Sequence, residues 1–159
     1  MYTRRISTRD LSGFFYFKEE IAMKNDVLKA SVVAAKVIPN VSPDMIKELK
    51  IPDEYKSLAL ITADIDDVLY TALDEATKKA EVQVVYAKSS YGGAVNANSK
   101  LAGEVIGILA GPNPAEVKSG LDAVIDTIEN GAYFVSANED DSISYYAHCI
   151  SRTGSYLSE

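Results

Sequence analysis

Leu58-Ala59-Leu60-Ile61-Thr62-Ala63-Asp64 is the stretch that decides the fold of this chain. Its apolar run is too short for a helix and is bounded by polar residues, so it predicts a buried strand. In the segment after it, apolar residues recur with the spacing of one helix face, at Leu69, Ala72, Leu73, Ala76 and Ala80. A buried strand followed by an amphipathic helix is therefore expected here.

The same helix is expected to turn a charged face to solvent, made of Asp74, Glu75, Lys78 and Lys79. A second strand then opens with three valines, Val82, Val84 and Val85. This strand–helix–strand unit predicts the first half of a compact α/β domain.

A similar order recurs further along the chain, where 103–109 predicts a strand. The helix after it is marked by Asn113 as a cap, Pro114 at the first position and Glu116 at the third, as in a capping box. Asn130-Gly131 is expected to supply a left-handed exit from this helix. Its expected buried stripe is Val117, Leu121, Val124, Ile125 and Ile128.

Shorter elements flank these two units. We expect a strand over 30–38, a short helix over 44–49 that Ser42 caps, and closing strands over 133–136 and 145–150. The predicted fold is α/β (α+β), a mixed sheet with helices on one face.

Composition excludes several classes of function. The 159 residues suit one domain of about 100–150 residues plus an appendage. The net charge of −7, with scattered basic residues, argues against a nucleic-acid partner, which needs a basic face. No apolar run approaches the ~18 residues of a membrane span. The single Cys149 excludes an internal disulfide and fits a reducing cytoplasm.

The first 22 residues differ from the rest of the chain. They hold Phe14-Phe15-Tyr16-Phe17 without a period that would bury the aromatic rings, and they lack the order of a secretory signal. The hypothesis is that 1–22 is an extension, from a misassigned start or disordered, and that the protein proper begins at Met23. Sequencing the native N-terminus tests it, and finding Met1 there would end it.

The residues offer no catalytic constellation. His148 and Cys149 are neighbours in a predicted strand, where adjacent side chains point to opposite faces, so they are interpreted as ordinary strand residues. One histidine and one cysteine are too few for a soft-ligand metal site. Neither 107–111 nor Gly92-Gly93 has the context of a phosphate-binding loop. No metal, cofactor or enzymatic activity is expected.

Two long stretches, 58–85 and 103–123, resemble the two halves of a bacterial microcompartment shell domain. The closer resemblance is to the ethanolamine-utilisation type of shell protein. It rests on four motifs, which are Ala63-Asp64-Ile65-Asp66-Asp67, Asp74-Glu75-Ala76-Thr77-Lys78, Ala110-Gly111-Pro112-Asn113-Pro114-Ala115-Glu116 and Ser151-Arg152-Thr153-Gly154-Ser155-Tyr156-Leu157. The resemblance runs from about Met23 to the last residue.

The resemblance implies a permuted, ferredoxin-like shell domain over 23–159, with 1–22 outside the family. Such proteins carry two domains in tandem, so the second domain is expected to be absent from this chain. They assemble as trimers that imitate hexamers and tile a shell with other shell proteins in the cytoplasm. The domain face made to meet a second domain is expected to be apolar and prone to association.

The resemblance also implies two functional features. The segment Tyr91, Gly92, Gly93, Ala94, Val95, Asn96, Ala97 and Asn98 takes the place of a pore-facing loop that gates small-molecule passage, the alternative being a floppy connection. Asp66 and Glu104, with Phe134 as a third member, match a pocket for ethanolamine, whose ammonium group wants carboxylates and an aromatic face. The alternatives are a helix cap for Asp66 and a solvent-facing charge for Glu104.

Two other classes of function remain open. A ferredoxin-like small-molecule-sensing regulatory module would form a small soluble oligomer and no layers. An acid/base enzyme that uses Asp66 and Glu104 is the third hypothesis, and it lacks a nucleophile, a metal set and a cofactor loop.

Overall fold

The computed structural model describes residues 26–89 and 104–150, which form two β-sheets and the helices packed on them. The larger sheet has four strands: β2 (Val32–Ile38), β3 (Ser57–Ala63), β5 (Val105–Gly111) and β4 (Gln83–Ser89), in that spatial order. Each strand pairs antiparallel with its neighbour.

This strand order confirms the permuted ferredoxin-like fold. In the ferredoxin-like arrangement two strand–helix units interleave, and a further strand occupies the edge beside the first strand. Here that edge strand is β2, which comes before both units in the chain. The expected mixture of parallel and antiparallel pairs is not observed, because every described strand pair is antiparallel. β3 and β4 run in the same direction, but β5 lies between them and pairs with both.

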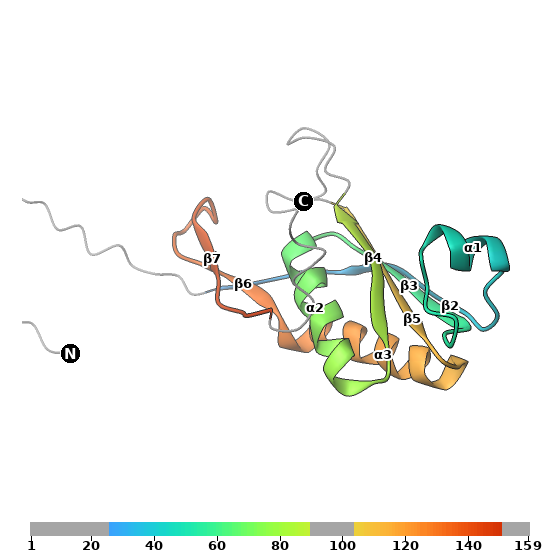
Figure 1. Ribbon diagram of the computed structural model, residues 1–159. Coiled ribbons are helices and arrows are strands. Elements are labelled where there is room, and N and C mark those ends of the chain that lie inside the picture. Colours follow the sequence, from blue (N-terminus) through green and yellow to red (C-terminus); the bar gives the residue numbers. More distant parts are fainter. Residues whose placement is uncertain (1–25, 90–103, 151–159) are drawn as a thin grey trace, which may run out of the picture.

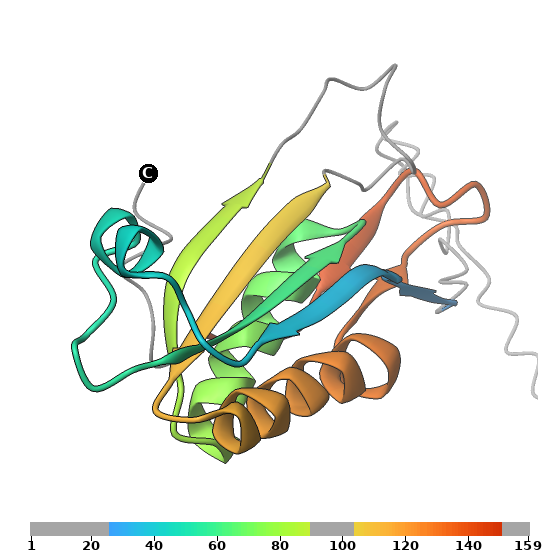
Figure 2. The same ribbon diagram turned by 90° about the vertical axis from the view of Figure 1, so that its right-hand side faces the viewer.

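Two long helices, α2 (Asp66–Lys79) and α3 (Pro114–Asp126), cover one face of this sheet, as Figure 2 shows. They enclose the main core, whose fully buried members include Leu69, Leu73 and Leu109. The short helix α1 (Pro43–Glu48) belongs to a second cluster that contains Leu58 and Ile108, on the opposite face. The expectation of helices on one face therefore holds for α2 and α3 and does not extend to α1.

The smaller sheet consists of β1 (Val27–Lys29), β6 (Tyr133–Ser136) and β7 (Ser144–Tyr146), and it projects beside α2 in Figure 1. It contacts that helix through Tyr146, whose hydroxyl lies 2.7 Å from Thr71 Oγ1 and 3.3 Å from the backbone oxygen of Asp67. The strand predicted over 145–150 is wrong in its extent, because β7 ends at Tyr146.

The predicted helix starts are confirmed. Ser42 Oγ accepts the N–H of Met45 at 3.3 Å, and Asn113 Oδ1 accepts that of Glu116 at 2.9 Å. The capping box is only half formed, since the Glu116 carboxylate accepts the N–H of Glu81 at 2.8 Å. Glu116 therefore joins the start of α3 to the turn that comes after α2.

The end of α3 differs from the prediction. The helix continues into a π-helical turn, η1 (Thr127–Gly131), that closes with the N–H of Ala132 donating to Thr127 O at 2.8 Å. Neither Asn130 nor Gly131 adopts the left-handed conformation. The widened turn itself satisfies the terminal carbonyl, so the left-handed exit is wrong.

The charged face predicted for α2 is wrong at Asp74, whose side chain is 0% exposed. Eight of the fourteen residues of α2 are buried, so the helix is covered beyond its sheet-facing stripe. Lys78 Nζ lies 2.7 Å from Asp74 Oδ2, and hydrogen bonds to Asp74 and Glu75 raise the pKa of Lys78.

Within the described ranges, no helix is long and apolar enough to cross a membrane.

Candidate functional site at the end of the sheet

Asp66 lies at the turn from β3 into α2. The cap residue of α2 is Ile65, which makes no side-chain cap hydrogen bond, and Asp66 is the first helical residue. Its Oδ1 accepts the N–H of Asp67 at 2.9 Å. The cap interpretation of Asp66 is therefore wrong by one residue, although its carboxylate does serve the first turn.

Glu104 is brought to the same end of the sheet by strand pairing. Ala63, the last residue of β3, is in register with Val105, the first residue of β5, and Glu104 immediately precedes Val105. Glu104 also lines a hollow of about 150 Å³ together with Val33 and Thr62. Asp66 comes three residues after Ala63, so both residues lie at the end of the sheet from which the chain passes from β3 into α2.

Phe134 belongs to β6 of the other sheet. Its ring packs against Tyr146 with 4.7 Å between centroids, and the Tyr146 hydroxyl reaches α2 at Thr71. Burial is the main cause that raises the pKa of Tyr146 to about 12. Strand register therefore brings Asp66 and Glu104 to one end of the larger sheet. Phe134 lies in the smaller sheet, and its described link to α2 runs through Tyr146.

Tyr70 is a member of this region that the sequence prediction missed. Burial raises its pKa, and the negative charge of Asp66 raises it further, whereas a backbone hydrogen bond with Ser89 lowers it. Burial, followed by the charge of Asp66, also raises the pKa of Asp67. The spacing of four residues between Asp66 and Tyr70 on α2 is the signal that could have found it.

The segment from Tyr91 to Asn98 lies outside the described residues. The strands on either side of it are described, and Ser89, at the end of β4, is in register with Val105, at the start of β5. Since Ala63 is also in register with Val105, the chain leaves and re-enters the sheet at the end that carries Asp66 and Glu104.

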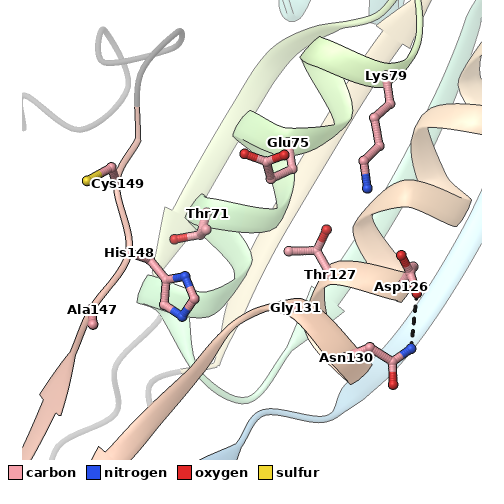
Figure 3. Close-up of a pocket in the computed structure, with 10 residues that line it drawn as sticks. All are labelled: Thr71, Glu75, Lys79, Asp126, Thr127, Asn130, Gly131, Ala147, His148 and Cys149. Carbon is pink, nitrogen blue, oxygen red and sulfur yellow. Dashed lines mark hydrogen bonds between the residues drawn. The ribbon is translucent and has the colours of Figure 1, made fainter.

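A second cavity, of about 440 Å³, lies between α2, the end of α3 and the segment after β7 (Figure 3). His148 and Cys149 both line it. Their predicted placement on opposite faces of a strand is wrong because β7 ends before them, although Figure 3 shows the Cys149 sulfur pointing away from the imidazole. Over residues 26–89 and 104–150, no group of three or more His, Cys, Asp or Glu side chains could hold a metal ion.

The class of protein follows from the fold together with the comparison with protein families. The model of the BMC domain matches residues 57–139, and the chain belongs to this family.

Among individual proteins, the chain is similar to the bacterial microcompartment shell protein EutL. It is 68% identical over 137 residues to EutL of Clostridium perfringens, covering 86% of this chain and 63% of that protein. Identity to EutL of Escherichia coli is 55% over 133 residues, covering 84% and 61%. The crystal structure of the ethanolamine utilization protein EutL from Leptotrichia buccalis is 70% identical with a TM-score of 0.74, over 86% of this chain and 63% of that one. The chain thus spans less than two thirds of the length of these relatives.

Proposed function

We propose that this chain is a structural, non-enzymatic shell domain of an ethanolamine-utilisation microcompartment. The observation that carries the proposal is its 68% identity over 137 residues to a shell protein, joined to a BMC domain match. The domain over 23–159 is the unit that builds the shell, within the cytoplasm.

Assembly is part of the proposal. The domain associates with copies of itself and with other shell proteins as a trimer that imitates a hexamer. Both outer strands of the larger sheet, β2 and β4, carry exposed apolar side chains, with Val33 58% and Tyr86 39% exposed. Apolar groups at sheet edges favour association with a neighbouring subunit.

Passage of small molecules is the activity of the assembled shell. We assign the pore lining to the segment from Tyr91 to Asn98. Support comes from the described residues that precede and follow it in the chain, since Ser89 is in register with Val105, and Val105 with Ala63, at the sheet end from which α2 begins. A loop anchored at both ends by one strand pair can change its conformation without disturbing the sheet.

Ethanolamine is the proposed ligand of Asp66, Glu104 and Phe134. At neutral pH its ammonium group needs anionic acceptors, and two carboxylates at one sheet end provide them. Phe134 provides an aromatic face for the same cation, in contact with Tyr146. Asp66 can bind the ligand with the oxygen that the Asp67 amide leaves available.

Calorimetric titration with ethanolamine tests this site. Asp66→Asn and Glu104→Gln keep the side-chain size and remove one charge each, so each should weaken binding by about tenfold or more, the value of a charged hydrogen bond. Asp122→Asn is the matched control, since Asp122 is 56% exposed on α3 and pairs with Lys118. Unchanged heats in both site variants would remove these residues from the site.

A further inference from the structure

We propose that the cavity between α2, the end of α3 and the segment after β7 is a separate binding site for a small organic ammonium ion. Its volume of about 440 Å³ falls in the range of small-molecule sites. It is lined by residues of three segments that are separate in the sequence: α2, the end of α3 with η1, and the residues after β7 (Figure 3). None of these residues belongs to the proposed site of Asp66, Glu104 and Phe134.

The floor of the cavity presents acceptors. Thr71 and Thr127 are 4% and 6% exposed, and both hydroxyls donate to carbonyls of their own helices, those of Asp67 and Ala123, at 3.0 and 2.8 Å. Thr71 Oγ1 also accepts the O–H of Tyr146 at 2.7 Å, so it keeps one lone pair for a ligand, whereas no described group donates to Thr127 Oγ1.

Two carboxylates stand above this floor, one from each helix. Glu75 Oε1 lies 2.6 Å from Lys78 Nζ, and Asp126 Oδ1 accepts from Asn130 Nδ2 at 3.0 Å, so each carboxylate keeps a second oxygen for a ligand. The end of α3 adds the negative pole of its dipole, and its last turn holds no basic residue.

Apart from the weak thiol donor of Cys149, the donors of the lining are Lys79, His148 and Asn130, whose amide already gives one N–H to Asp126. His148 Nε2 accepts the N–H of Tyr133 at 3.3 Å, which leaves only Nδ1 of the neutral imidazole to donate. Lys79 is the one cationic side chain among the described residues of the lining, and in Figure 3 its amine points down toward Thr127. An acceptor-rich cavity of this kind fits a donor-rich cation, and Lys79 opposes such a ligand by repulsion.

His148 is the only histidine of the chain, so its ring signals in NMR report on the cavity and need no assignment of other residues. The experiment titrates ethanolammonium chloride into the Asp66→Asn/Glu104→Gln double variant at constant ionic strength and pH. That background lacks the proposed ethanolamine site, so failure of one proposal is distinguishable from failure of the other. We expect a saturable shift of the His148 signals, and only a weak response to tetramethylammonium, which has no N–H donor.

Variants in the lining give effects of opposite sign. Glu75→Gln or Asp126→Asn should raise the half-saturating concentration about tenfold, whereas Lys79→Gln should lower it. Asp122→Asn, on the exposed side of α3, is the matched control and should change nothing. A shift that grows linearly with concentration would overturn the proposal. A half-saturating concentration that stays unchanged in both carboxylate variants would also overturn it. Weaker binding in Lys79→Gln would do the same, since that result is expected of an anion site.

Discussion

Tyr146 is the residue through which the smaller sheet holds α2. Its hydroxyl donates to Thr71, its ring packs on Phe134, and a second ring, that of His148, lies 4.6 Å away between centroids. Thr71 and Tyr146 are 75 positions apart in the sequence. Local sequence patterns cannot predict a contact between residues so far apart in the chain.

Tyr146→Phe removes the hydroxyl and keeps the ring. At pH 7 we expect the variant to lose about 1 kcal/mol of unfolding free energy, the value of a neutral hydrogen bond. Urea unfolding followed by circular dichroism measures this loss. An unchanged midpoint would mean that the hydroxyl contact contributes nothing.

Alkaline pH should reduce the advantage in unfolding free energy that the unmodified chain has over the Tyr146→Phe variant. The pKa of Tyr146 rises from 10.0 to about 12 in the folded chain. Between these values the unfolded chain releases the phenol proton that the folded chain keeps, so this group's contribution falls as pH rises. The Phe variant lacks that loss. A difference in unfolding free energy that stays constant or grows from pH 9 to pH 11.5 would contradict this assignment.

Single residues were the least predictable level of the molecule. Asp74 belongs by periodicity to a charged face, yet the fold buries it beside Lys78. The sequence spacing relates Tyr70 to Asp66 on α2, but its contact with Ser89 of β4 depends on the tertiary fold. In contrast, Asn113 and Ser42 were predictable as caps because a cap contacts its own helix only.

At the scale of elements, the long helices and buried strands are predictable from periodicity. Residues 58–64 and the stripe of α2 have local patterns that match their burial in the core, and all five predicted stripe residues of α3 and η1 are at least partly buried. The division into two sheets was not predictable, since β1 and β7 are three residues each and β1 pairs with the distant strand β6. The π-helical exit of α3 likewise has no established sequence signal.

Close packing of α3 on the sheet can be tested at Gly111, the last residue of β5. A Cβ there would lie 2.9 Å from Val117 Cγ1 and 3.1 Å from the carbonyl oxygen of Glu81. Gly111→Ala should therefore cost about 1–3 kcal/mol of unfolding free energy, as overpacking does. Denaturant unfolding gives the value.

Gly131→Ala is the matched control for that measurement. Its added Cβ would meet Thr127 at 3.5 Å, an ordinary contact, and its backbone needs no positive φ. The control should change stability by less than about 0.5 kcal/mol. Equal losses at the two positions would show that the tight contact at Gly111 is not the cause.

At the scale of the whole molecule, the proposed function depends on surfaces that meet other chains. The described surface leaves large apolar side chains exposed on both sheets, at Val27, Val33, Tyr86, Ile143 and Tyr145. Three of them, Val27, Ile143 and Tyr145, lie in or beside the smaller sheet, where Val27 and Tyr145 share Val135 as their strand partner. The proposed assembly into a shell needs such surfaces, because exposed apolar groups favour association with other chains.

Electron microscopy tests the central claim, that this chain builds a shell, most directly. The chain is purified together with the remainder of its Clostridium perfringens relative, of which it covers 63%, and the sample is imaged beside the chain alone. The account predicts ring-shaped particles that pack into flat hexagonal layers. Discrete small particles that never form layers, at any concentration, would contradict it and favour a ligand-sensing module with the same fold.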